Sequence, residues 1–220
     1  DLDNTLVGDD AALAELNRHL IRHREEYGTV IVYSTGRSLT LYRELQAEQN
    51  LIEPDYLVVS VGTVIYSQGS DRPDPRWASH LAQGWDREQV VATATHFADL
   101  VFQPDSEQTD FKVSFYLEDA IASDLLPDLE LALRQRNMDV QLVYSSGKDL
   151  DILPRQGNKG AAVTFLQGEL SMAPPRTVVC GDSGNDLSMF TTGKTKGIIV
   201  GNARPELRQW HSQQTSPDFY

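Results

Sequence analysis

The sequence predicts an α/β fold in which a Rossmann-like parallel-sheet core is interrupted by an inserted α+β cap domain. Near both ends of the chain, short β-branched runs alternate with segments of helical spacing, which favours a parallel sheet covered by helices. Residues 67–80 are rich in proline, glycine and serine, which indicates a linker. Residues 111–118 then alternate strictly between apolar and polar side chains, as a half-buried antiparallel strand does.

We therefore divide the 220 residues into a first core part (1–76), the cap (77–153) and a second core part (154–220). In the first part, leucines at helical spacing with Asp9 or Asp10 as N-cap indicate one helix, and a second helix starts near Ser38. Short runs of β-branched residues indicate the strands. The expected elements are a helix over 9–24, a strand over 29–34, a helix over 38–50, and strands over 55–60 and 63–66 around Gly62.

The cap is expected to mix helices with antiparallel strands, because its strands alternate and a short polar turn joins two of them. Its elements are helices over 87–100 and 121–137, the strand over 111–118, and a hairpin of 140–145 with 150–153. After Pro154 the α/β pattern resumes. Its elements are a helix over 158–170 with Asn158 as N-cap, a strand over 176–181, a helix opening over 184–190, a strand over 197–200 and a helix from Pro205.

Composition limits the possible partners and compartments. With 19 basic and 32 acidic residues the formal charge is −13, which argues against a nucleic-acid partner and means that an anionic substrate needs a local cation. The single Cys180 excludes an intrachain disulfide and fits a reducing compartment. No stretch has the length of a membrane span and no signal peptide is visible, so we expect a cytoplasmic protein that does not bind membranes.

Polar residues follow the apolar runs at several places along the chain. Ligands of parallel α/β sheets bind outside the carboxyl ends of the strands, so these residues mark the edge where chemistry is expected. They are Thr35, Gly36 and Arg37, then Asp182, Ser183, Gly184, Asn185 and Asp186, then Lys159 at a helix start, and Asp1 and Asp3, which join this edge if an apolar strand precedes them.

These residue types suit a bound phosphoryl group. Aspartates are the hard oxygen ligands that Mg²⁺ prefers, and four of them in one crevice repel one another unless a cation joins them. Thr35 offers a hydroxyl, and Gly36 lets backbone N–H groups approach a phosphate. Lys159 adds a positive charge at the positive end of a helix dipole. The constellation therefore favours a phosphoryl group held between a metal ion and a lysine.

Each motif taken alone also has an ordinary structural interpretation. The opening DLDNT is typical of a capped turn, and GDSGND is typical of a turn rich in Gly, Asn and Asp. The second motif lacks the downstream Glu that a calcium-binding EF-hand needs. Lys159 alone is typical of a solvated helix start. The motifs taken together, in this order, favour the phosphate site.

The sequence resembles the haloacid-dehalogenase-like phosphatase superfamily in four motifs that occur in the same order. These are D-x-D-x-T at residues 1–5, Thr35 in YSTGR, Lys159 in NKG, and G-D-x-x-x-D at 181–186. The insert lies between the second and third motifs, as in members whose α+β cap is typical of sugar phosphatases. Finer stretches such as SSGKDLDILP and VVCGDSGNDLSMF resemble the sucrose-phosphate phosphatases, and the likeness covers nearly the whole chain.

The resemblance implies roles for the acidic residues. Asp1 would be the nucleophile that forms an aspartyl-phosphate, and Asp3 the general acid toward the leaving sugar oxygen and then the base toward water. Mg²⁺ would be held by the Asp1 side chain, the Asp3 carbonyl and Asp182. Asp186 would support the metal's waters or Lys159 from behind.

The resemblance also implies the phosphate and sugar contacts. Thr35, Gly36 and Lys159 would hold the phosphoryl oxygens, with Ser183 and Asn185 supporting the metal site from its second shell. The cap would recognise the sugar through the polar turn of its hairpin, while the alternative for that turn is a solvent-facing loop. The sugar-binding residues would be Lys112, Ser145, Ser146, Gly147, Lys148, Asp149 and Asn158.

The expected activity, by resemblance, is Mg²⁺-dependent hydrolysis of sucrose 6-phosphate to sucrose and phosphate, the last step of sucrose synthesis. One alternative is a phosphatase with the same kind of cap that acts on mannosyl-phosphoglycerate or trehalose phosphate. Another is a non-catalytic module that binds sugar phosphate, although such modules usually lose a motif and none is lost here. We expect a monomer whose partners are the sugar phosphate and sucrose-phosphate synthase. The resemblance also implies a core strand before Asp1 and a helix after Tyr220, so we expect a trimmed fragment.

Overall fold

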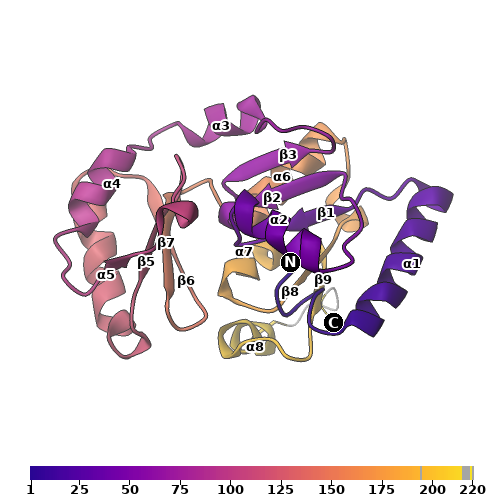
Figure 1. Ribbon diagram of the computed structural model, residues 1–220. Coiled ribbons are helices and arrows are strands. Elements are labelled where there is room, and N and C mark those ends of the chain that lie inside the picture. Colours follow the sequence, from indigo (N-terminus) through magenta and orange to yellow (C-terminus); the bar gives the residue numbers. More distant parts are fainter. Residues whose placement is uncertain (194, 215–218, 220) are drawn as a thin grey trace.

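The first part of the core is a three-stranded sheet with helices on both faces. The computed structural model describes residues 1–193, 195–214 and 219. Strands β1 (Val32–Ser34), β2 (Tyr56–Val59) and β3 (Val64–Ser67) lie in that order, and β1 runs parallel to β2 (Figure 1). Strand β3 runs antiparallel to β2, because the 3-10 turn η1 (Ser60–Gly62) between them is too short for a crossover.

The alternation of side chains along β2 divides the core into layers. Leu57 and Val59 face α2 (Leu39–Glu48), and they pack with Tyr42 and Leu45 of that helix. Val58 faces the opposite side, where α3 (Pro75–Leu81) and α6 (Lys159–Glu169) cover the sheet. The result is a helix–sheet–helix sandwich, as the sequence predicts.

The second part of the core adds the parallel pair β8 (Val178–Gly181) and β9 (Lys196–Ile199). Helices α7 (Leu187–Thr191) and α8 (Pro205–Ser212) pack on this pair around Phe190 and Leu207. Helix α1 (Asp10–Tyr27) lies on the side of the core opposite the cap, and Asp9 caps it by accepting the N–H groups of Ala11 and Ala12 (Figure 1). In the part of the chain that the structure describes, no helix combines the length and apolar character that crossing a bilayer requires.

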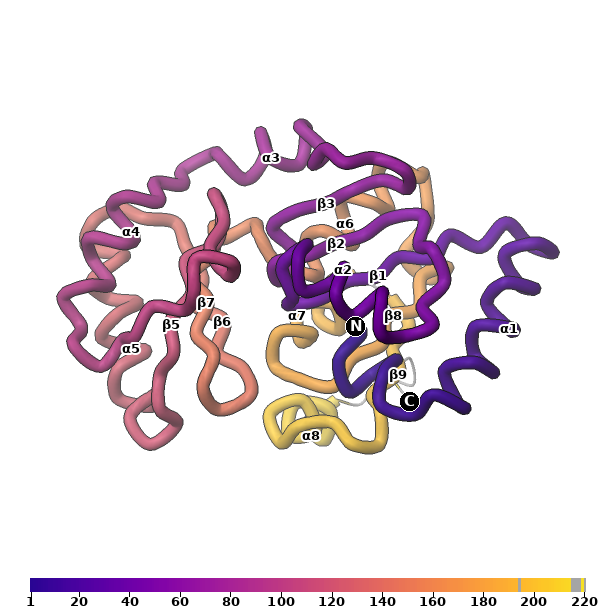
Figure 2. Tube along the Cα trace, viewed as in Figure 1, coloured from indigo at the N-terminus to yellow at the C-terminus, as the bar shows by residue number. Residues whose placement is uncertain are grey.

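The cap is an antiparallel sheet with two helices on one face. Its strands are β4 (Val101–Phe102), β5 (Val113–Tyr116), β7 (Asp149–Pro154) and β6 (Val140–Ser145), in that spatial order. Helices α4 (Arg87–Ala94) and α5 (Asp119–Gln135) bury the face that carries Val113 and Phe115. The short 3-10 turn η2 (Asp105–Glu107) lies between β4 and β5. The tube in Figure 2 shows this unit beside the core, joined to it through α3 and the chain after β7.

Most of the expected elements form, with shifted ends. Ser38 caps α2 and Asn158 caps α6, as predicted, and the hairpin of residues 140–153 is confirmed. The strand expected over 29–34 shortens to β1, and the helix expected over 87–100 ends at Ala94. These differences arise because a local sequence pattern indicates that a helix or strand is present but does not define its first and last residues.

Helix α3 packs with the core. The Trp77 side chain is 1% exposed, its ring lies 5.1 Å from that of Phe165, and its indole N–H donates to the Gly62 carbonyl at 3.1 Å. Leu81 belongs to the same buried cluster. We propose on this packing that the cap begins after Leu81, whereas the linker composition had placed its start at residue 77.

Gly62 allows the turn after β2 to touch the start of α6. Its φ is +100°, and a Cβ atom built on it would overlap the backbone of Asn158 and Lys159. Only glycine fits such a close approach of two backbones at positive φ. The contact places the first residue of α6 at the carboxyl end of β2.

Candidate active site

The opening DLDNT is a tight turn that carries two carboxylates. The Leu2 carbonyl accepts the N–H groups of Thr5, Leu6 and Val7 at 2.9–3.2 Å, and the Leu2 side chain is fully buried. The backbone nitrogen of Asp1 donates to the Cys180 carbonyl at 2.8 Å, so Asp1 lies beside the end of β8. The motif therefore forms the tight turn of the structural interpretation, and this turn presents the carboxylate of Asp1 beside the end of β8.

Lys159 is the buried cation that joins the motifs. Its side chain is fully buried, and its Nζ donates to Asp1 Oδ1 at 2.8 Å and to Asp186 Oδ1 at 2.7 Å. Both carboxylates are also buried, with side chains 5% and 0% exposed. Burial removes the water around this ammonium group, and the two carboxylates replace the hydrogen bonds that water would make.

Asp186 belongs to the loop after β8 and uses both of its oxygens. Oδ2 accepts the N–H groups of Asp182 and Ser183 at 3.0 and 3.1 Å, in a capping box with Ser183, while Oδ1 accepts from Lys159. A side chain at Gly181 would collide with the Asp186 side chain. Burial opposes the ionisation of Asp186, but the charge of Lys159 and these hydrogen bonds hold its pKa below the usual value.

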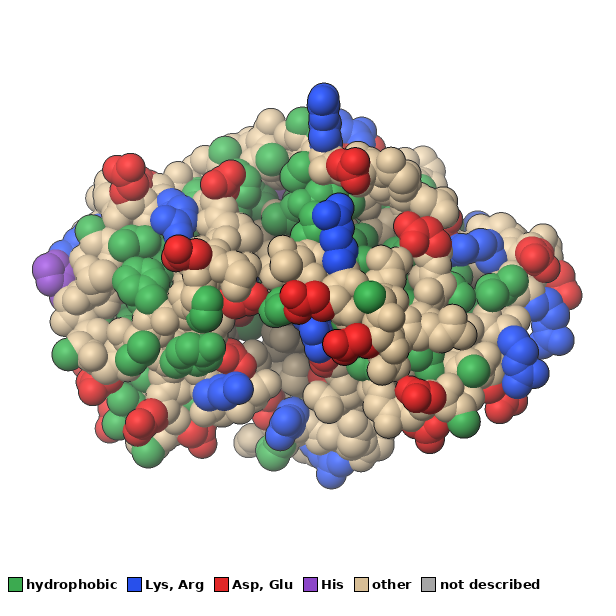
Figure 3. All heavy atoms as spheres, in the orientation of Figure 1, with side chains coloured by type: hydrophobic (Ala, Val, Ile, Leu, Met, Phe, Trp, Pro, Cys, Tyr) green, Lys and Arg blue, Asp and Glu red, His purple; other side chains and the backbone are tan. Residues whose placement is uncertain are grey.

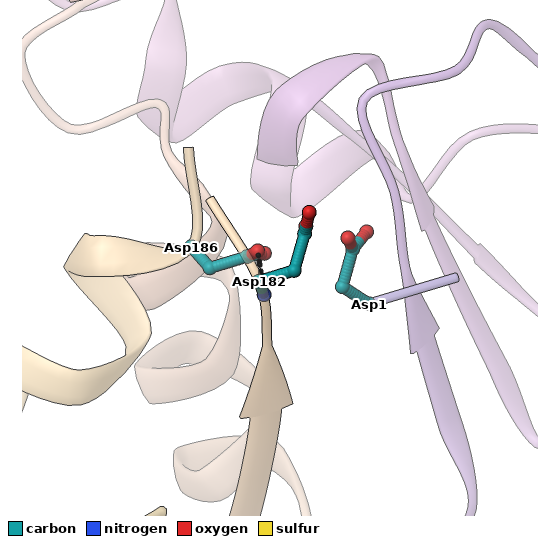
Figure 4. A group of neighbouring side chains, drawn as sticks. All are labelled: Asp1, Asp182 and Asp186. Carbon is teal, nitrogen blue, oxygen red and sulfur yellow. Dashed lines mark hydrogen bonds between the residues drawn. The ribbon is translucent and has the colours of Figure 1, made fainter. Parts of the chain in front are cut away.

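Asp182 completes a cluster of three carboxylates. Oxygens of Asp1, Asp182 and Asp186 lie within 4.8 Å of one another, and Figure 4 shows the carboxylates of Asp1 and Asp182 pointing into the same space. Burial raises the pKa of Asp182, and the charge of Asp186 raises it further. One lysine does not balance three carboxylates, so the cluster fits a divalent cation, and its oxygen donors are of the type that hard cations prefer.

Thr35 and Gly36 lie at the carboxyl end of β1, next to this cluster. Thr35 is fully buried, its N–H donates to the Val58 carbonyl, and its hydroxyl accepts the Arg37 N–H at 3.1 Å. A Cβ on Gly36 would lie 3.3 Å from the Asn185 side chain. The second and fourth sequence motifs are therefore neighbours in space.

Arg37 is a site residue for which the sequence analysis gave no role. Its Nε donates to Asp3 Oδ2 at 2.8 Å and its Nη2 to Asp3 Oδ1 at 2.7 Å, a bidentate ion pair. The hydrogen bond to Asp3 is the main reason why the pKa of Arg37 is raised. The position of Arg37 directly after the Thr-Gly pair at a strand end indicates a place near the site. Its partner Asp3 is 34 residues away, and the sequence spacing does not reveal that pairing.

Lys112 is held inside the cap. Only 2% of its side chain is exposed; its Nζ donates to Ser114 Oγ at 2.7 Å and lies 3.4 Å from Asp151 Oδ1 and 4.0 Å from Glu107 Oε2. Glu107 in turn accepts from the Ser38 hydroxyl of the core at 3.3 Å. The polar face that the sequence predicts for this strand is thus covered by η2 and continues to the α2 N-terminus.

The hairpin turn expected to recognise the sugar lies near the carboxylate loop. Ser145 is buried, while Ser146, Gly147 and Lys148 are exposed, and Ser146 and Gly147 have positive φ. A Cβ on Gly184 would lie 3.0 Å from the Tyr144 carbonyl, so strand β6 lies against the loop of residues 182–186. Figure 3 shows a hollow between the cap and the core, with acidic and basic side chains at its margin.

Asp149 and Asn158 both have partners at the edges of this region. Asp149 Oδ1 accepts from Gln103 at 3.0 Å, and burial raises the pKa of Asp149. Asn158 caps α6 through its Oδ1 and donates to the Gln141 side chain of the cap at 3.0 Å. The structure thus gives Asn158 a place at the junction between cap and core, which the sequence analysis did not anticipate.

Comparisons with known proteins agree on one family. A family model described as sucrose-6F-phosphate phosphohydrolase matches residues 1–219. Sucrose-phosphatase 2 of Nicotiana tabacum is 40% identical over 218 residues, which cover 96% of this chain and 51% of that protein. The mannosylfructose-phosphate phosphatase of Agrobacterium fabrum is 35% identical, covering 94% of this chain and 83% of that protein.

A solved structure is similar along nearly the entire chain. The X-ray structure of the sucrose-phosphatase from Synechocystis sp. PCC6803, in complex with sucrose and phosphate, superposes with a TM-score of 0.92 at 40% identity, covering 99% of this chain and 87% of that one. The chain spans about half the length of the plant sucrose-phosphatases that it matches.

The buried charges predict a strong coupling between Lys159 and Asp186. In Lys159→Met the carboxylates lose their cation, and we expect the free energy of unfolding to fall by about 3–5 kcal/mol. Adding Asp186→Asn should cost much less in that background than in the wild type, because it removes one of the uncompensated charges. Urea denaturation of the four proteins gives the coupling energy.

The matched control is Lys196→Met, which removes an exposed lysine from β9 and should change stability by less than about 0.5 kcal/mol. Additive effects of Lys159→Met and Asp186→Asn would contradict the buried ion pair.

Proposed function

The chain belongs to the sucrose-6F-phosphate phosphohydrolase family, and we propose that it hydrolyses sucrose 6-phosphate to sucrose and inorganic phosphate. The observation that carries the proposal is the buried Lys159, which draws Asp1 and Asp186 together at the carboxyl end of the sheet beside Thr35. The relative that was solved with sucrose and phosphate supports the choice of substrate. The resemblance between this sequence and sucrose-phosphate phosphatases agrees with it.

Asp1 is the proposed nucleophile. One of its carboxylate oxygens forms a bond to phosphorus while the bond from phosphorus to the sugar oxygen breaks, which leaves an aspartyl-phosphate. Asp3 gives its proton to the departing sugar oxygen and then takes a proton from the water that attacks the aspartyl-phosphate. The water oxygen bonds to phosphorus while the bond from phosphorus to the Asp1 carboxylate breaks, which releases inorganic phosphate and regenerates Asp1.

The phosphoryl group lies between Lys159 and the loop of Thr35 and Gly36 in this proposal. Lys159 is charged and desolvated, so its attraction for phosphoryl oxygens is stronger than that of a surface lysine. The Thr35 hydroxyl and the backbone at Gly36 supply further donors. Phosphoryl transfer needs mainly positioning and charge neutralisation, and these groups provide both.

Mg²⁺ is the proposed cofactor, held by the side chains of Asp1 and Asp182 and the carbonyl of Asp3. When bound, it neutralises charge on the phosphoryl oxygens. Asp186 keeps Lys159 and the loop in place, because it accepts hydrogen bonds from the Lys159 ammonium and the Ser183 N–H. Ser183 and Asn185 lie in the same loop and would support the residues that hold the metal.

The cap is proposed to recognise the sugar, and to exclude water when it lies over the core. The proposed contacts are Lys112, Ser145, Ser146, Gly147, Lys148, Asp149 and Asn158. A partner sucrose-phosphate synthase, a monomeric state and a cytoplasmic location stay predictions.

A related disaccharide phosphate is the second candidate substrate. The mannosylfructose-phosphate phosphatase is matched over 83% of its own length, more than the plant relatives are, so its substrate class is favoured as the alternative. Mannosyl-phosphoglycerate and trehalose phosphate are the remaining enzymatic alternatives, and a non-catalytic sugar-phosphate binder is the other class.

A panel of phosphate esters tests the substrate. We expect release of phosphate from sucrose 6-phosphate with a kcat/KM at least about tenfold above that for mannosylfructose phosphate, trehalose 6-phosphate or glucose 6-phosphate, since a cap built for one disaccharide gains contacts that the others lack. Asp1→Asn supplies the blank. Faster turnover of another ester would reject sucrose 6-phosphate as substrate, and activity equal to that of Asp1→Asn would favour the non-catalytic module.

Cation binding should release a proton. Burial and Asp186 raise the pKa of Asp182, so this carboxyl keeps its proton at a higher pH than an ordinary Asp, and a bound Mg²⁺ expels that proton. In the metal-free protein, the ionised Asp182 therefore costs stability in full above its raised pKa, and this cost is lost as the pH falls from that pKa to the ordinary Asp value. Calorimetric titration with Mg²⁺ at mildly acidic pH should give heats that differ between buffers of different ionisation enthalpy.

In Asp182→Asn that buffer dependence should vanish, and chelation of the metal should abolish turnover in the wild type. Identical heats in all buffers would contradict the proposed ligand.

A further inference from the structure

The ion pair between Arg37 and Asp3 is a close contact of the site that the proposed mechanism does not use. Each Asp3 oxygen accepts one nitrogen of the guanidinium, at 2.7 and 2.8 Å. The third nitrogen, Nη1, donates to the Leu41 carbonyl in the first turn of α2 at 3.3 Å. Each of the three guanidinium nitrogens therefore has an acceptor. Two of them fix the plane of the Asp3 carboxylate.

Stability does not account for this arrangement. The side chains of Arg37 and Asp3 are 29% and 41% exposed, and ion pairs at that exposure contribute little to folding. The bidentate geometry instead defines the direction of a carboxylate, which matters for a group that transfers a proton.

The backbone of Arg37 belongs to the loop that carries the phosphate contacts. Its N–H donates to the Thr35 hydroxyl at 3.1 Å, and its carbonyl accepts the Ser60 N–H at 2.8 Å. The three consecutive residues 35–37 thus hold the expected phosphoryl contact at one end and Asp3 at the other. This short segment therefore fixes the position of the Asp3 carboxylate relative to Thr35.

We propose that Arg37 is a positioning residue that aims the Asp3 carboxyl at the oxygen of the leaving group. This inference rests on the proposed phosphatase function. In the structure both Asp3 oxygens accept from Arg37, so a protonated Asp3 loses one of these two hydrogen bonds and keeps the other. The bond that remains holds the carboxyl while its O–H proton moves to the ester oxygen, as phosphorus transfers from that oxygen to Asp1.

The test compares two leaving groups in the full-length protein. A sugar alkoxide needs the proton as it leaves, whereas p-nitrophenolate leaves without one. In Arg37→Lys and Arg37→Gln, we expect the first-turnover release of sucrose from sucrose 6-phosphate to slow at least about 30-fold. First-turnover release of p-nitrophenol from p-nitrophenyl phosphate should slow less than about threefold, because this step needs no acid and precedes the attack of water.

Arg43→Lys and Arg43→Gln are the matched controls. Arg43 lies on α2 with a side chain 60% exposed, and its ion pair with Asp71 is long, at 3.7 Å, and open to solvent. Both rates should therefore stay within about twofold of wild type. The dissociation constant for inorganic phosphate, measured by calorimetry, should also be unchanged in the Arg37 variants, because Arg37 does not hold phosphate in this account.

The outcomes separate this inference from the proposed function. Equal slowing of both esters, or weaker phosphate binding, would make Arg37 a substrate ligand and overturn the positioning role. A wild-type protein that ignores sucrose 6-phosphate but hydrolyses another sugar phosphate would overturn the proposed substrate, and the comparison then runs with that ester. A wild-type protein that hydrolyses neither a sugar phosphate nor p-nitrophenyl phosphate would overturn both.

Discussion

The fully buried ammonium group of Lys159 is the constraint on which the site depends. It ties the first residue of the chain to a loop near residue 186 through carboxylates at 2.8 and 2.7 Å. A buried ammonium group that has lost its water requires both carboxylate partners. Three segments therefore have to lie next to one another: the turn at residues 1–5, the start of α6 and the loop after β8. The glycines at 62, 160 and 181 allow these segments to pack closely, because a Cβ atom at each position would collide with the neighbouring segment.

The same constraint links the insert to the core. The chain returns from the cap through Pro154 and enters α6 five residues later, so the helix that carries Lys159 begins where the cap ends. Asn158 caps that helix and also donates to Gln141 of the cap, while Glu107 of the cap accepts from Ser38 at the start of α2. These contacts, together with the approach of β6 to the loop of residues 182–186, place the cap sheet beside the carboxylate loop. The proposed substrate, with a phosphate at one end and hydroxyl groups at the other, would reach both regions.

The sequence predicts the parts of this site that are set by position along a strand or helix. Residues that follow strands converge at the carboxyl edge, so the meeting of Thr35, Asp182 and Lys159 could be expected, as could the N-caps at Ser38 and Asn158. The pairing of Arg37 with Asp3 could not, because it depends on side-chain direction across two loops. The burial of Lys112 was also out of reach, since alternation along a strand defines a polar face but not the turn η2 that covers it. The linker composition places the start of the cap at Trp77, and it carries no information about the packing of α3 against Phe165 on which the proposed later start rests.

In the proposed function, this cluster is a phosphoryl-transfer centre in which Asp1 carries the phosphoryl group. The direct measurement is rapid acid quenching during turnover of sucrose 6-phosphate, followed by mass spectrometry of the peptides. We expect one phosphoryl group on the peptide that contains Asp1, and none in Asp1→Asn. In Asp3→Ala it should accumulate with p-nitrophenyl phosphate as substrate, because the leaving group needs no acid while water lacks its base. A phosphoryl group on any other residue, or turnover with no phosphorylated peptide at any quench time, would contradict it.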